Sequence, residues 1–180
     1  AGTYVFHVTV EGDEALATPV QVRIQVLSTT WYIALLIGLT AVASVHAAGY
    51  AKQKVVYHIN YDNPKQQTGA LRNIQNHINA VGAENMDIKV VLHGNGLALL
   101  VVPESLPKLK KFKHANADMN MAAKIDGLKN QGVAFNVCAN TVKGRGVSLE
   151  DDLYDVDQAD IVPSGVAELA HLQAQGYTYI

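Results

Sequence analysis

The fold is decided by the stretch Lys54-Val55-Val56-Tyr57-His58-Ile59-Asn60, which is followed by the turn residues Asp62-Asn63-Pro64. Apolar β-branched and aromatic side chains dominate the first run, so it predicts a buried strand. Pro64 suits the first turn of a helix. Apolar residues then recur at helical spacing until Gly82 ends the pattern, at Leu71, Ile74, Ile78 and Val81. The sequence therefore predicts a strand followed at once by an amphipathic helix.

The alternation of strand and helix continues to the end of the chain. Further strands are predicted over residues 88–92, 133–138, 161–162 and 177–180, and helices are predicted around Met121, Ile125 and Leu128 and after the cap residue Ser164. Elements in this order form right-handed crossovers and a mostly parallel sheet. We expect an α/β domain over residues 51–180, with helices on both faces of the sheet. Ligands and chemistry are then expected at the carboxyl ends of the strands.

Residues 1–27 follow a different pattern. Two runs of alternating side chains, 3–10 and 20–26, flank the polar segment 11–14, and this predicts a β-hairpin. The Gly2-Thr3-Tyr4 start and the alternating valines resemble the last two strands of an immunoglobulin-like sandwich. One hairpin is marginal in water on its own. We therefore interpret residues 1–27 as a fragment of a larger β-domain, or as strands that pair with another chain.

Residues 28–50 form a hydrophobic segment, with no charged residue between Arg23 and Lys52. Its apolar part, 31–48, predicts a membrane anchor or a signal peptide, because Val45-His46-Ala47 before Ala48 has the small residues of a cleavage site. A buried core helix is the alternative. Cleavage would release the main domain outside, in the periplasm or beyond. Without cleavage the domain would be membrane-anchored, and the lysines that follow the segment would hold it in the cytoplasm.

Composition excludes several classes of protein. The 180 residues are 49% hydrophobic and carry a formal net charge of −2, which argues against a disordered chain and against a nucleic-acid binder. A single cysteine excludes an intrachain disulfide framework and a Cys-based zinc site. The seven histidines show no metal-ligand spacing. We expect neither a metal nor a cofactor.

Two charged runs are interpreted as solvated surface. The first is basic and predicts an exposed helix face, and the second is acidic but lacks the glycine of a calcium loop. They comprise Lys108, Lys110, Lys111 and Lys113, and Glu150, Asp151, Asp152, Asp155, Asp157 and Asp160.

Cys138 is the best candidate for chemistry, because it ends a predicted central strand. Asn140 or Thr141 could cap a helix that starts immediately afterwards, and amides at a helix start lower the pKa of a thiol. Lys143 and Arg145 add cations close by in the sequence. A buried, inert thiol is the alternative. The turn His93-Gly94-Asn95-Gly96, at the end of the neighbouring strand, is either a plain turn or a nest of amides for an anion.

The main domain resembles the DsrE/DsrF-like family of small sulfur-relay proteins, and most closely its exported members with a single cysteine. The matching stretches are Lys54 to Ile59, Val91-Leu92-His93-Gly94 with Gly96-Leu97, Val133 to Thr141, and Val162-Pro163-Ser164-Gly165-Val166 leading to Gln175-Gly176-Tyr177. The resemblance implies a flavodoxin-like three-layer fold and assembly into trimers or hexamers. In sulfur-relay members of the family a cysteine carries a persulfide, and its position corresponds to Cys138.

Two functions from different classes remain open. The first is a persulfide carrier on Cys138, supported by Asn140, Thr141, Lys143, Arg145, His93 and Gly94. Because the chain has one cysteine, a donor or acceptor protein or a small thiol would have to exchange the sulfur. The second is a non-catalytic oligomeric module that binds a small ligand or scaffolds a complex, in which Cys138 only packs.

Overall fold

The computed structural model describes residues 3–5, 23–25 and 50–180 of the chain. These belong to two separate units, residues 1–48 and 49–180. In the first unit, β1 (Thr3–Val5) pairs antiparallel with β2 (Arg23–Gln25), with Tyr4 opposite Ile24. This pair is the described part of the predicted hairpin. The immunoglobulin-like interpretation of 1–27 and the signal or anchor segment 28–50 otherwise fall on residues outside the described ranges.

The second unit is built on a five-stranded sheet in the order β6-β5-β4-β3-β7. All four neighbouring pairs are parallel, so the predicted mostly parallel sheet is entirely parallel here. The strands are β3 (Gln53–Ile59), β4 (Met86–Leu92), β5 (Ala134–Cys138), β6 (Ile161–Val162) and β7 (Thr178–Tyr179). β4 is the central strand, whereas β5 lies between β4 and β6.

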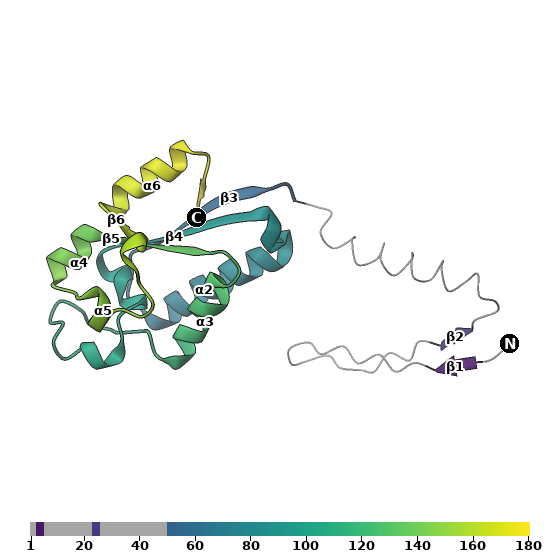
Figure 1. Ribbon diagram of the computed structural model, residues 1–180, viewed down its shortest axis with the longest axis horizontal. Helices are drawn as coiled ribbons and strands as arrows, with labels where there is room; N and C mark the ends of the chain where they lie inside the picture. The colour runs from purple at the N-terminus through teal and green to yellow at the C-terminus, as the bar shows by residue number, and fades with distance from the viewer. Residues whose placement is uncertain (1–2, 6–22, 26–49) are drawn as a thin grey trace. The chain divides into compact units, whose positions relative to one another are not determined.

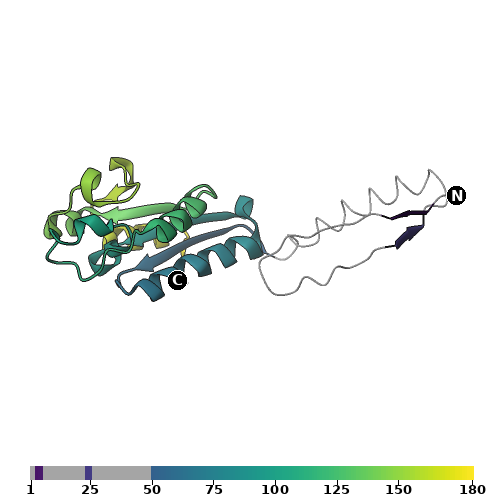
Figure 2. The ribbon, with the colours of Figure 1, turned by 90° about the horizontal axis from the view of Figure 1, so that it is seen from below.

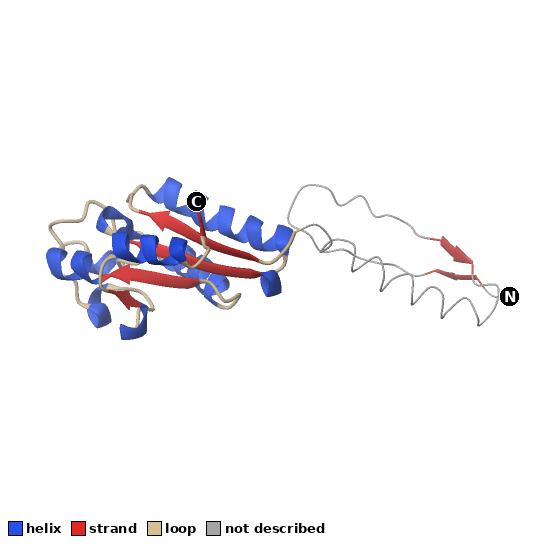
Figure 3. Cartoon of the chain, turned by 90° about the horizontal axis from the view of Figure 1, so that it is seen from above, coloured by secondary structure: helices blue, strands red, loops and turns tan. Residues whose placement is uncertain are grey.

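Helices cover both faces of this sheet and give three layers (Figure 1). On one face lie α2 (Pro64–Val81) and α3 (Met119–Lys129) (Figure 2). On the other face α6 (Gly165–Ala174) lies across β3, β4 and β5 (Figure 3). Asn63 caps α2, whose end is fixed by Gly82 at φ 92°, a conformation that a side chain disfavours. This is the α/β, flavodoxin-like architecture that the sequence predicts.

The core divides along the alternation of the strands. Alternate residues such as Val55, Val90 and Phe135 face α2 and α3 in a large cluster, where Phe135 is 1% exposed. The opposite face holds a smaller cluster with α6, made of Val56, Val91, Leu169, Leu172 and Tyr177. Beyond this cluster the same face carries His58 and ends at Cys138, because both continue the alternation.

Short helices and turns form the segment between β4 and α3 and the segment between β5 and β6. The first contains the 3₁₀ helices η3 (Gly94–Leu99) and η4 (Pro103–Ser105), and the second contains the α-helices α4 (Ala139–Arg145) and α5 (Leu149–Asp152) and the 3₁₀ helix η5 (Gln158–Asp160). A further 3₁₀ helix, η2 (Ala83–Asn85), joins α2 to β4. The helix predicted for the basic run 108–113 is wrong: these residues form turns, and Phe112 is buried beneath the guanidinium of Arg145, 4.5 Å from the ring centroid.

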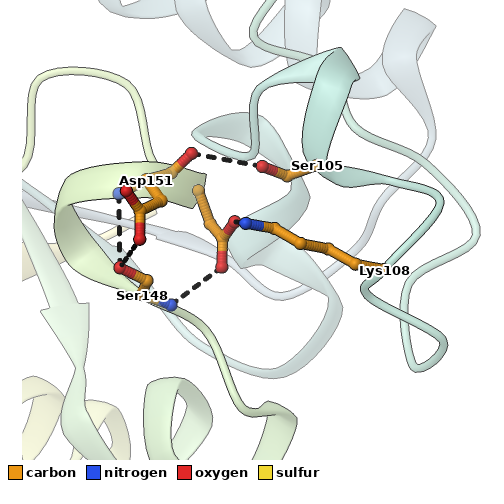
Figure 4. A network of polar contacts seen from close by, with 5 residues as sticks. Ser105, Lys108, Ser148 and Asp151 are labelled. Atoms are coloured by element: carbon orange, nitrogen blue, oxygen red, sulfur yellow. Dashed lines mark hydrogen bonds and ion pairs between the residues drawn. The ribbon is translucent and has the colours of Figure 1, made fainter.

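The prediction that the acidic run is solvated is wrong for Asp152, whose side chain is 3% exposed. Its carboxylate lies 2.6 Å from Nζ of Lys108 and accepts a hydrogen bond from the amide of Ser148 at 2.8 Å. Ser105 donates to the backbone carbonyl of Asp151, which ties η4 to α5 (Figure 4). A buried carboxylate is tolerated where such partners satisfy it.

Within residues 50–180 and the two short strands before them, no helix is long and apolar enough to cross a membrane. The segment 31–48 lies outside the described residues.

Candidate functional site

The carboxyl edge of the sheet brings together residues from all five strands. His58 lies near the end of β3, His93 follows β4, Cys138 ends β5, Gly165 follows β6, and Tyr179 ends β7. Parallel strands all end at one edge, so residues far apart in the sequence meet there.

Cys138 is the residue on which α4 begins, and it is 5% exposed. Burial on its own would raise the pKa of the thiol. Hydrogen bonds from the backbone amides of Gly165, Thr141 and Asn140, and from the hydroxyl of Thr141, outweigh burial and place the pKa below its ordinary value. These amides belong to the first turns of α4 and α6, where amides have no partner inside their own helix. The site therefore stabilises the thiolate relative to that of a free cysteine.

The predicted caps of α4 need a correction. The structure places Cys138 itself at the N-cap, and Asn140 and Thr141 lie in the first turn. Both still serve the site, because their amides face the sulfur. Thr141 also joins two loops, since its hydroxyl oxygen accepts a hydrogen bond from the amide of Gly94 at 2.9 Å. The predicted supporting residues Gly94 and Thr141 are thus in direct contact.

The turn after β4 is held in place by contacts with the end of β3 and with α2. A Cβ on Gly96 would lie 1.8 Å from the carbonyl oxygen of Ile59, so only glycine fits there. Gln67, which is 0% exposed, donates to the carbonyl of Gly96 at 3.2 Å and accepts from the amide of Asn116 at 2.7 Å. These contacts fix the position at which His93 and Gly94 leave the sheet.

Gly165 is in contact with both Cys138 and His93. A Cβ placed there would lie 2.9 Å from Cβ and 3.3 Å from Cδ2 of His93, and 3.3 Å from Cβ of Cys138. The absence of a side chain lets the start of α6 approach the sulfur. The predicted site residue His93 therefore lies beside Cys138, against the same glycine.

His93 in turn stacks on His58, with ring centroids 4.7 Å apart and planes inclined by 23°. Nδ1 of His58 lies 2.8 Å from the hydroxyl of Tyr179. Its Nε2 is buried and has no hydrogen-bond partner among the described residues. Burial, and then the proximity of His93, lower the pKa of His58, so this ring is neutral at pH 7.

The two predicted cations occupy the other end of α4. Arg145 donates to Oδ1 of Asn95 at 2.6 Å and to the carbonyl of Lys111 at 2.9 Å. Lys143 is exposed. Neither is among the groups that lower the pKa of Cys138. The thiol is therefore activated by amides and a hydroxyl, and Arg145 fastens the loops around the site.

Sequence reasoning missed His58, Gly165 and Tyr179. His58 lies near the carboxyl end of the strand that decides the fold, and this position at the edge where chemistry is expected could have identified it from the sequence. Nothing local to Gly165 or Tyr179 indicated a role, because their contacts with this edge are tertiary. Among the described residues, no group of three or more His, Cys, Asp or Glu side chains is placed to hold a metal ion.

Comparison with known proteins identifies a family and similar solved structures. The model of the DsrE/DsrF-like family matches residues 53–180. One of these solved structures is that of MTH1491, a protein of unknown function from Methanobacterium thermoautotrophicum, with 27% identity and a TM-score of 0.56. The similarity covers 71% of this chain and 97% of that one. No curated protein matches the chain.

Proposed function

Because the chain belongs to the DsrE/DsrF-like family, we propose that it is a sulfur-relay protein that carries sulfane sulfur as a persulfide on Cys138. Family membership supports a function of the sulfur-relay type. The assignment to Cys138 is carried by one observation: the thiol of this cysteine faces amides from the starts of two helices, which lower its pKa. A thiolate is the nucleophile that sulfur transfer requires.

Sulfur uptake would proceed by attack of the Cys138 thiolate on the outer sulfur of a donor persulfide. The new S–S bond forms on Cys138 as the S–S bond of the donor breaks, and the electron pair leaves with the donor thiolate. Release is the same exchange in reverse, with an acceptor thiolate attacking the outer sulfur and the Cys138 thiolate departing. No net oxidation occurs. The amides that stabilise the thiolate also stabilise the anionic form of the persulfide.

The acceptor must lie outside this chain, because the chain has a single cysteine. Cys138 is 5% exposed, so a narrow group such as a small thiol, or a cysteine on a protruding partner loop, fits the approach. We propose such a donor or acceptor protein as the partner.

Assembly and location are further parts of the proposal. A trimer or hexamer is favoured by the family resemblance and by exposed apolar side chains near the carboxyl edge, where Val166 is 65% and Tyr179 49% exposed. Export to the periplasm, or anchoring in a membrane, is favoured by the uncharged segment 31–48.

Intact-mass measurement after incubation with a sulfane-sulfur donor tests the function. One added sulfur atom per chain, removed by a reducing thiol and absent from Cys138→Ser, is the expected result. Serine is itself a good N-cap, so this variant should keep α4 and the fold. If the wild type takes up no sulfur, or if the folded serine variant takes up as much, Cys138 is a packing residue and a ligand-binding or scaffolding module is the better account.

A further inference from the structure

A stacked pair of imidazoles lies beside the thiol, and the reaction described above gives it no task. His93 contacts Gly165, against which Cys138 also packs. The edge of the His93 ring at Cδ2, the carbon bonded to Nε2, is the edge that faces this glycine. His58 stacks on the His93 ring, with ring centroids 4.7 Å apart, and its Nδ1 is hydrogen-bonded to the hydroxyl of Tyr179.

The environment distinguishes the two rings. For His58, an added proton would leave a charged, buried N–H without a partner among the described residues, at Nε2. Two charged rings at this separation would also repel each other. A proton added to this pair is therefore disfavoured on His58.

We propose that His93 is the acid–base partner of Cys138 in sulfur transfer, and that His58, held by Tyr179, is a positioning residue that fixes the His93 ring and stays neutral beside it. This inference rests on the proposed function for the identity of the sulfur donor. Its chemistry applies to any exchange at this thiol that expels a basic thiolate.

The proton balance explains why such a residue is needed. His93 accepts the proton of the Cys138 thiol, and the thiolate attacks the donor's outer sulfur. The donor thiolate leaves with the electron pair of the broken S–S bond, and His93 returns the same proton to it. Donor persulfide and Cys138 thiol thus become Cys138 persulfide and donor thiol, without any other reactant. A neighbouring base of this kind is the usual way to activate a nucleophile.

Glu168, Asp87 and Tyr179, which lie on the same face of the sheet, are bonded to other partners. Glu168 of α6 accepts a hydrogen bond from Asn136 at 3.2 Å, and Asp87 of β4 accepts one from Tyr177 at 2.6 Å. Lys89 lies 3.6 Å from Asp87. Tyr179 is bonded to His58. His93 is therefore the ring best placed to exchange a proton with the sulfur.

The test compares two reactions of Cys138 in the full chain at pH 7. Hydroxyethyl disulfide expels an alkyl thiolate that needs a proton, whereas iodoacetamide expels iodide, which does not. We divide the rate with hydroxyethyl disulfide by the rate with iodoacetamide. Any change in the thiolate population affects both rates equally and cancels in this ratio. For His93→Gln we expect this ratio to fall ~10²-fold, within the usual range for general acid catalysis. His58→Gln should lower the ratio less, because His58 acts only through His93.

The exposed His114 supplies the matched control, since His114→Gln should leave the ratio unchanged. Circular dichroism and thermal unfolding show whether each variant is folded. If both rates fall equally in folded His93→Gln, or if neither falls, His93 does not deliver the proton to the leaving thiolate and the proposal is overturned. Failure of the wild type to take up sulfane sulfur, with the His93 effect on disulfide exchange intact, would instead overturn only the proposed function.

Discussion

Adding one methyl group at Gly165 tests whether the close approach of α6 activates the thiol. A Cβ at this position would lie 2.9 Å from Cβ of His93, closer than real Cβ atoms approach, and 3.3 Å from Cβ of Cys138. In Gly165→Ala, either His93 or the start of α6 must therefore move. Movement of α6 takes the Gly165 amide away from the sulfur, and movement of His93 disturbs its stack on His58.

The expected change in the free energy of unfolding follows from two opposing effects. Overpacking costs about 1–3 kcal/mol, whereas replacing glycine by alanine in a helix gains up to about 1 kcal/mol. Gly127 is the matched control, because it is exposed in α3 and no atom lies within 4 Å of a Cβ built on it. Gly127→Ala keeps the gain without the clash. The two variants should thus differ in free energy of unfolding by about 1–3 kcal/mol.

Urea denaturation measures this difference, and the pH dependence of alkylation measures the pKa of Cys138. We expect Gly165→Ala to be the less stable variant and to raise the thiol pKa by about one to two units, since a hydrogen bond to a charged group contributes about 1.5–3 kcal/mol and one pKa unit is about 1.36 kcal/mol. Equal stabilities of the two variants, together with an unchanged thiol titration, would refute the inferred contact between α6 and the sulfur.

Two further predictions concern the frame around the site. Asp152→Asn should lower the free energy of unfolding at pH 7 by about 1–3 kcal/mol. Burial favours the neutral carboxyl, but bonds from Lys108 and Ser148 outweigh burial and lower the pKa of Asp152. The stabilisation is therefore present above about pH 4 and lost as pH falls through the folded-state pKa. In urea titrations the difference in free energy of unfolding between wild type and Asp152→Asn should vanish at low pH. A difference that is the same at every pH would contradict this explanation. Tyr177→Phe removes the bond to Asp87. Burial, and then this bond, raise the pKa of Tyr177 to about 12, so its contribution of about 1 kcal/mol should persist to about pH 10 and vanish as pH rises toward the folded value. An ultraviolet difference titration in which the residue ionises near 10 would be inconsistent with this environment.

The strands, the long helices and the position of Cys138 could be predicted because each depends on local patterns. β-branched runs mark the strands, and Asn63 with Pro64 and Gly82 marks both ends of α2. Cys138 lies at the end of one such run, directly before a helix start, so its environment of amides follows from the sequence.

The rest depends on tertiary contacts that local patterns do not encode. His58 and Tyr179 are 121 residues apart in the sequence and meet because β7 joins the sheet beside β3. The basic run at 108–113 has apolar residues at helical spacing, yet Phe112 is held by Arg145 from α4. Asp152 resembles its solvated acidic neighbours in sequence, yet its side chain is 3% exposed and pairs with Lys108, which lies in another loop.

The arrangement at the carboxyl edge of the sheet predicts a Cys138 thiol whose pKa is lowered by the amides of two helix starts and by the hydroxyl of Thr141. The rate of alkylation by iodoacetamide, followed by intact mass from pH 5 to pH 10, tests it most directly, because only the thiolate reacts and the chain has one cysteine. The account predicts a midpoint clearly below about 8.5, the value of a free cysteine. A midpoint at or above about 8.5 would mean that burial dominates and that Cys138 is a packing residue.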